Sequence, residues 1–285
     1  MPSFPIIDSH VHLYDPDRIR MPGFDDSPIL NRRYGLKEFR EHTAGIAVEG
    51  LVFAEVNVSP FYALIEAQWV ASLAAQDPIV KGIVAQAPVE FGERARVYYE
   101  TVAAVSPLVK GVRQITQWES DPEFCLRPDF VRGVQILPEY GLSFDICILH
   151  HQLASHIELV RRCPETSFIL DHIAKPDMKQ HPREPWWTQI AEMAALPNVV
   201  CKVSGIPTEA DHERWTIDDV RPYMERVFEV FGEDRVMYGG DWSVVLLAST
   251  YRRWYDTVET VTAGFSETAR RKFWADNARR WYRLA

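Results

Sequence analysis

Residues 6–12 have the sequence Ile-Ile-Asp-Ser-His-Val-His, which begins with β-branched apolar residues and ends with two histidines. The apolar beginning predicts a short buried strand. Side chains two positions apart in a strand point to the same face, so we expect His10 and His12 to project together where the strand ends. Such an imidazole pair can bind a divalent metal or transfer protons near neutral pH. Taken alone, a His-x-His pair is more often a chance feature of a surface turn. A functional role for this pair therefore needs support from other residues of the chain.

The composition narrows the class of protein. At 285 residues the chain is long enough for two small domains or for one large α/β domain. A net charge of −9 without a basic stripe argues against a nucleic-acid partner. No apolar run is long enough to span a membrane, and Pro2 and Asp8 interrupt the place of a signal peptide. The four cysteines, among them Cys147 and Cys201 in predicted strands, lack metal-ligand or redox spacing, which predicts a reduced, cytoplasmic protein.

Strand and helix patterns alternate along the whole chain. The strand patterns cover residues 6–12, 50–58, 80–86, 109–115, 142–149, 167–170, 199–203 and 235–238. The helix patterns cover residues 36–46, 60–76, 92–105, 128–140, 152–162, 186–196, 216–231, 250–263 and 266–280. Eight strands, each followed by a helix, predict a closed (β/α)8 barrel in one domain over residues 1–285. A doubly wound open sheet is the alternative, but no Gly-x-Gly-x-x-Gly follows the first strand.

Ionisable residues fall at the carboxyl ends of these predicted strands, where barrels of this kind have their active sites. They are His10 and His12 after the first strand, Arg113 after the fourth, His150 and His151 after the fifth, His172 after the sixth and Asp241 after the eighth. Closing the barrel would gather these side chains in one pocket. One of the two adjacent histidines of the fifth strand must point away from it, because neighbours in a strand face opposite sides.

Each residue also has a structural explanation. Asp241 could cap a helix after two glycines, His172 could be a core histidine, and Arg113 could be a salt-bridge partner rather than a substrate clamp. Two tryptophans in loops after strands four and eight, Trp118 and Trp242, could line a sugar-sized pocket. The long loop 14–33 is either a lid or wall of the site or a disordered excursion. The remaining histidines are expected at the surface: His42, His156, His181 and His212.

Five motifs together resemble the amidohydrolase superfamily, in particular its amidohydrolase-related branch (amidohydrolase 2) of lactonases and metal-dependent decarboxylases. They are Ile-Asp-Ser-His-Val-His at 7–12, Lys-Gly-Val-Arg-Gln at 110–114, Phe-Asp-Ile-Cys at 144–147, Leu-Asp-His-Ile-Ala-Lys-Pro at 170–176 and Tyr-Gly-Gly-Asp-Trp-Ser at 238–243. The second and fourth motifs are most similar to those of the sugar-lactone and dicarboxylate-lactone hydrolases.

The resemblance implies a (β/α)8 barrel and a set of catalytic residues. That set is His10, His12, His172 and Asp241. The same four residues would hold one divalent metal, such as zinc, although some relatives work without metal. Binuclear members carry a carboxylated lysine at the end of strand four. Here Arg113 stands at that end and Lys110 lies near the start of the strand, which argues against a bridged two-metal site.

The expected reaction is hydrolysis of a small polar lactone, a sugar-acid 1,4- or 1,5-lactone of the fucono, rhamnono or galactono type. Asp241 would activate water, and the histidines would polarise the carbonyl. The substrate would be bound by Arg113, His150, His151, Trp118 and Trp242. The alternative in another reaction class is a zinc-dependent decarboxylase of an aromatic or unsaturated acid, and a more distant one is a barrel that only binds a ligand. No pattern in the chain predicts an oligomeric state.

Overall fold

The computed structural model of the chain describes residues 2, 4–180 and 183–285. Eight strands form one parallel sheet in sequence order. They are β1 (Ile6–Val11), β2 (Val48–Ala54), β3 (Val80–Gln86), β4 (Val109–Arg113), β5 (Ser143–Ile146), β6 (Phe168–Leu170), β7 (Val199–Val203) and β8 (Val236–Tyr238). A bridge between Val11 and Trp242 brings the last strand back to the first. The predicted (β/α)8 barrel is confirmed.

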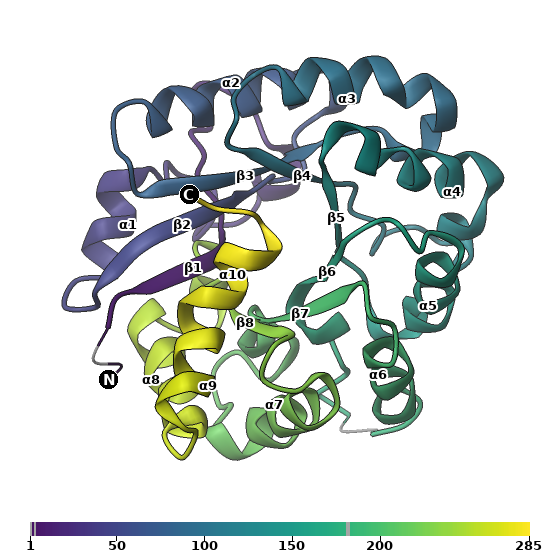
Figure 1. Cartoon of the computed structure of the whole chain (residues 1–285). Helices are drawn as coiled ribbons and strands as arrows, with labels where there is room; N and C mark the ends of the chain where they lie inside the picture. Colours follow the sequence, from purple (N-terminus) through teal and green to yellow (C-terminus); the bar gives the residue numbers. More distant parts are fainter. Residues whose placement is uncertain (1, 3, 181–182) are drawn as a thin grey trace.

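The helices surround the strands, as Figure 1 shows. They are α1 (Leu36–His42), α2 (Ala63–Ala74), α3 (Arg96–Ala103), α4 (Pro128–Gln135), α5 (Leu153–Arg162), α6 (Trp186–Ala194), α7 (Ile217–Phe231), α8 (Tyr251–Thr262), α9 (Glu267–Arg271) and α10 (Asn277–Trp281). The predicted last helix, 266–280, contains a π-helical segment, Lys272–Asp276, between α9 and α10. No helix in the described part of the chain is both long enough and apolar enough to cross a membrane.

The amino-terminal end of the barrel is closed by apolar packing. The strands contribute a buried cluster of Ile7, Val52, Val84, Ile169, Val200 and Met237. Ala275, Ala278 and Tyr282 from the end of the chain pack against this cluster, and α10 lies across this end of the barrel in Figure 1. The carboxyl end of the strands is therefore the end that a ligand can enter, as in other barrels of this type.

A β-bulge in β1 turns the two histidines toward the barrel interior. Asp8 pairs with Leu51 and Val11 pairs with Phe53, so three steps along β1 match two steps along β2. An extra residue of this kind reverses which face the following side chains occupy. Ile7 points into the barrel before the bulge, and His10 and His12 point into it after the bulge.

The Asp8 carboxylate, which points outward, fastens the first strand to the loop after β8. One of its oxygens accepts hydrogen bonds from the backbone N–H groups of Gly240 (2.7 Å) and His10 (3.0 Å). The other accepts a hydrogen bond from the hydroxyl of Tyr251 on α8 (2.9 Å). Asp8 is fully buried, and burial raises its pKa to about 7.

Four strands end earlier than their sequence patterns predict, and two of them end three or more residues earlier. The strand predicted over 50–58 spans Val48–Ala54, and the strand predicted over 142–149 ends at Ile146. The chain leaves β5 because the Gln152 side chain accepts a hydrogen bond from the Leu149 N–H (3.0 Å), which starts the turn into α5. The adjacent histidines 150 and 151 consequently lie in a 3₁₀ turn rather than at a strand end.

The loop 14–33 is ordered at its base by two hydrogen bonds between the backbones of Tyr14 and Tyr34, each 2.9 Å long. The predicted surface position of His156 is wrong. Its ring is buried on the inner side of α5, with Nδ1 2.9 Å from the Gln152 carbonyl oxygen, because it shares the helix face that packs on the barrel. His42 is half-buried, His212 is exposed, and His181 lies outside the described residues.

Removing the carboxylate of Asp8 should destabilise the barrel. In Asp8→Ala, two buried backbone N–H groups, those of Gly240 and His10, lose their acceptor. We expect the free energy of unfolding in urea to fall by about 3 kcal/mol. The exposed Asp17 provides the control, and Asp17→Ala should change stability by less than about 0.5 kcal/mol. Equal stability of the two variants would contradict the role of Asp8.

Candidate active site

A cavity of about 410 Å³ opens at the carboxyl ends of the strands. Five of the residues predicted from the sequence line it: His12, Arg113, Trp118, His172 and Asp241. His10 lies directly beneath and has no exposed surface. The barrel therefore brings together residues from β1, β4 and the loops after β4, β6 and β8, as the predicted architecture requires.

His10, His12 and Asp241 point their polar atoms at one another. The Nε2 atoms of the two histidines are 3.2 Å apart. The Asp241 Oδ1 atom lies 3.3 Å from Nε2 of His12 and 3.7 Å from Nε2 of His10. Nδ1 of His12 is 2.8 Å from the carbonyl oxygen of Ala54 and must donate to it, because a carbonyl only accepts. In the neutral form of His12 the lone pair is then on Nε2, the atom that faces Asp241.

His172 and Asp241 pack against the loop after β7, at Ser204 and Gly205. Nδ1 of His172 is 2.9 Å from the Ser204 hydroxyl. Gly205 has φ +63°, and a Cβ there would lie 2.5 Å from the His172 ring and 2.7 Å from an Asp241 carboxylate oxygen. Only glycine permits this approach.

Burial and the neighbouring charges set the protonation states of this pair. Burial lowers the pKa of His172 to about 4. Burial alone would raise the pKa of Asp241, but the adjacent histidines, His172 first, outweigh it and hold the pKa below its usual value. At neutral pH the site therefore presents an ionised carboxylate beside an uncharged imidazole, which is the state that a general base requires.

Arg113 is both a salt-bridge partner and a wall of the cavity. Its guanidinium donates to Glu55 Oε1 (2.7 Å) and to Asp171 Oδ2 (2.9 Å), and both carboxylates are buried. Burial alone would lower the pKa of Arg113, but Glu55 first, and Asp171 with it, raise the pKa well above its ordinary value. The salt-bridge explanation offered by the sequence is therefore confirmed, and because Arg113 also lines the cavity, the role of a substrate clamp stays a prediction.

A second buried cation, Lys202, was missed in the sequence. Its ammonium lies 2.8 Å from Asp145, 2.9 Å from Asp171 and 3.2 Å from Nδ1 of His10. The signal was present, since Lys202 interrupts the apolar strand Val-Val-Cys-Lys-Val and Asp145 interrupts Ser-Phe-Asp-Ile. A charged residue inside an otherwise apolar buried strand needs a partner, and strand alternation points both residues into the barrel.

The donor atoms of His10, His12 and Asp241 are arranged so that they could hold one divalent metal. Oδ1 of Asp241 is buried and has no hydrogen-bond partner in the described part of the chain. It forms a group of possible ligands with His10 and His12. Ligand atoms of a tetrahedral zinc with bonds of about 2.0–2.1 Å are separated by about 3.3 Å. The three donor separations of 3.2, 3.3 and 3.7 Å are close to that spacing.

Three residues predicted to bind substrate do not line this cavity. His150 turns toward the carbonyl oxygen of Lys175 (3.2 Å), because β5 ends four residues before it, and His151 is exposed. Trp242 is completely buried, and its indole packs against the rings of Tyr34 and Phe39. Trp118 lies at the rim, with 66% of its surface exposed.

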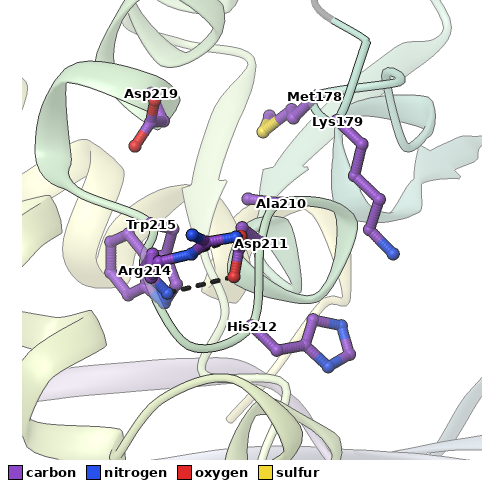
Figure 2. A pocket seen from close by; sticks show the side chains of 8 residues that line it. All are labelled: Met178, Lys179, Ala210, Asp211, His212, Arg214, Trp215 and Asp219. Atoms are coloured by element: carbon purple, nitrogen blue, oxygen red, sulfur yellow. Dashed lines mark hydrogen bonds and ion pairs between the residues drawn. The ribbon is translucent and has the colours of Figure 1, made fainter.

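The long loop after β1 supplies an apolar wall of the cavity through Met21, Phe24 and Leu30. A larger, more open hollow of about 650 Å³ lies between the loops after β6 and β7 (Figure 2). It contains an ion pair of Asp211 with Arg214 and none of the predicted catalytic residues. The smaller cavity is therefore the candidate active site.

A sequence model with the description Amidohydrolase matches residues 7–284. The chain belongs to the amidohydrolase family. An L-fucono-1,5-lactonase from Burkholderia multivorans is 32% identical over 187 residues, which cover 62% of this chain and 63% of the relative. An L-rhamnono-gamma-lactonase from Scheffersomyces stipitis is 24% identical over the full length of both chains. A crystal structure of an amidohydrolase from Burkholderia multivorans with bound zinc has a TM-score of 0.90 and 26% identity, covering 99% of this chain and 100% of that chain.

Replacing Lys202 by methionine should strongly destabilise this amidohydrolase. The substitution leaves the buried carboxylates of Asp145 and Asp171 without their cation, and breaking a buried pair from one side costs about 3–5 kcal/mol. Lys37→Met is the matched control, because Lys37 pairs with Glu41 at the surface and should contribute less than about 1 kcal/mol. Chemical denaturation measures both, and similar values for the two variants would contradict the role of Lys202.

Zinc should stabilise the folded protein through His12 and Asp241. At roughly 100 times the dissociation constant, a bound ion should raise Tm by about 5 °C. The shift should disappear in His12→Gln and persist in His212→Gln, which changes an exposed histidine outside the cavity. A shift that survives in His12→Gln would place the ion elsewhere.

Proposed function

We propose that this amidohydrolase opens a small polar lactone by hydrolysis, and that the substrate is a sugar-acid 1,4- or 1,5-lactone. The observation that carries the proposal is the Asp241 carboxylate, which lines a cavity of about 410 Å³ and has Oδ1 3.3 Å from Nε2 of His12 and 3.7 Å from Nε2 of His10. That volume suits a molecule the size of a monosaccharide. The named activities of the fucono- and rhamnono-lactonase relatives support the same substrate class.

The proposed reaction uses Asp241 twice. Its carboxylate removes a proton from water as the water oxygen attacks the lactone carbonyl carbon. The ring C–O bond then breaks, and Asp241 returns the proton to the leaving alkoxide, so the product is the open hydroxy acid. Because Asp241 stays ionised at neutral pH, it is ready to accept the first proton.

The charge that develops on the carbonyl oxygen needs donors that are fixed in advance. His172, held by Ser204, supplies a ring N–H, and Arg113, anchored by two carboxylates, supplies a positive charge on the same cavity wall. A metal bound by His10, His12 and Asp241 would supply Lewis-acid polarisation of the carbonyl.

A pH-indicator screen over sugar lactones tests the proposal, because opening a lactone releases acid. Asp241→Asn keeps the shape of the side chain and removes the base, so we expect kcat to fall by about 10²–10⁴-fold. Asp211→Asn, in the hollow of Figure 2, is the control and should leave kcat unchanged.

A wild-type protein that opens no lactone would refute the proposal, as would full activity of Asp241→Asn. Release of CO₂ from an aromatic or unsaturated acid would instead establish the decarboxylase alternative. Removing metal with a chelator then tests whether the lactone reaction needs the ion: activity of metal-free protein would assign catalysis to the side chains alone.

A further inference from the structure

Four consecutive residues after β6 have left-handed backbone conformations. Their φ values are +53° at His172, +51° at Ile173, +60° at Ala174 and +46° at Lys175. None of them is glycine, and L-residues disfavour this region because Cβ crowds the following carbonyl oxygen. Strain of this kind is retained where the surrounding structure imposes it, often beside a functional site.

One internal hydrogen bond and contacts from two other elements hold this left-handed turn. The Lys175 N–H donates to the His172 carbonyl oxygen (2.8 Å). The Trp186 indole N–H donates to the Ile173 carbonyl oxygen (2.8 Å), and the His150 ring lies 3.2 Å from the Lys175 carbonyl oxygen. Residues 172 and 175, one turn apart, both line the active-site cavity. The turn thus places the Lys175 side chain in the same cavity as His172.

The Lys175 ammonium lies at the cavity and uses one of its three N–H groups in a hydrogen bond. Its side chain is only 15% exposed. Nζ donates to Gln117 Oε1 (2.6 Å), and the nearest carboxylate oxygen, on Glu209, lies 3.9 Å away, beyond hydrogen-bonding range. No other hydrogen bond from Nζ is formed within residues 2, 4–180 and 183–285. An ammonium has three N–H groups, so two remain for a ligand.

We propose that Lys175 is a specificity-determining residue that donates hydrogen bonds to a ring substituent of the lactone. The substituent is a hydrogen-bond acceptor, either a hydroxyl or a carboxylate. The inference rests on the proposed lactonase function of the same cavity. Much of the wall away from the catalytic cluster is apolar, including Met21, Phe24, Leu30, Val56, Val244 and Leu247. Away from Arg113 and the catalytic cluster, Ser27, Asn57, Gln117 and Lys175 are the polar side chains of the lining, and of these four Lys175 carries a charge.

The experiment compares three lactones of one ring size: a hydroxylated sugar 1,5-lactone, a lactone carrying a carboxylate, and the unsubstituted δ-valerolactone. In Lys175→Met we expect kcat/KM to fall roughly 10- to 100-fold for at least one of the two substituted lactones, mainly because KM rises. δ-Valerolactone should lose less than about twofold, because it has no group for the ammonium to bind. The larger loss, on the hydroxylated or the carboxylated lactone, identifies the natural acceptor.

Two further variants separate the role of the ammonium from damage to the fold. Lys179→Met removes a nearby lysine that lines the other hollow (Figure 2) and should behave as wild type. Lys175→Arg keeps a cationic donor and should keep the preference for the substituted lactone. An equal loss on all three lactones, or no loss on any, would overturn the inference.

A wild-type protein that opens no lactone would refute the proposed function but would still leave Lys175 testable. Calorimetry with a six-carbon aldonate then replaces kinetics, with the hydroxy acid of δ-valerolactone as the unsubstituted ligand. Lys175→Met should weaken aldonate binding by roughly 10-fold or more relative to wild type. An unchanged dissociation constant would overturn the inference.

Discussion

The buried ion network inside the barrel is the constraint on which the active site depends. Lys202 is fully buried, and it is tolerated there because Asp145 and Asp171 each lie within 2.9 Å of its ammonium. The same ammonium lies 3.2 Å from Nδ1 of His10. Lys202 and its two carboxylates therefore lie beneath His10 and fix the position of its ring. The hydroxyl of Tyr282, near the end of the chain, donates to Asp145, so the packing that closes the barrel also supports the floor of the site.

The same network affects how a metal could bind in the site, because Arg113 lies beside one of the possible metal ligands. Arg113 occupies the end of β4, where binuclear amidohydrolases of this superfamily carry a carboxylated lysine. Its Nη1 lies 3.3 Å from Nε2 of His10, the same nitrogen that would ligate a metal. A guanidinium and a divalent cation compete for this lone pair, so His12 and Asp241 offer the less contested ligands. The arrangement accommodates one ion and supplies a fixed positive charge of its own.

The alternation of strands and helices could be predicted from the sequence because each strand carries its own apolar pattern and each helix its own period. Strand geometry predicts that His10 and His12 share a face. The bulge that turns them inward depends on the pairing of β1 with β2, and the sequence of β1 alone does not predict it. β5 ends before the predicted residue because its apolar run continues past Ile146, whereas a side-chain hydrogen bond of Gln152 turns the chain there. Lys202 interrupts an apolar strand, which indicates a buried charge, but its partners Asp145 and Asp171 are remote in sequence and reach it only when the barrel closes.

The central claim is that water, activated by Asp241, attacks the carbonyl carbon of a lactone. Hydrolysis in water enriched with oxygen-18, followed by mass spectrometry of the product, tests it most directly. We predict one labelled oxygen in the carboxylate of the hydroxy acid and none in the new hydroxyl. Label in the hydroxyl group would show that the ring C–O bond breaks on its alkyl side, and it would contradict the account.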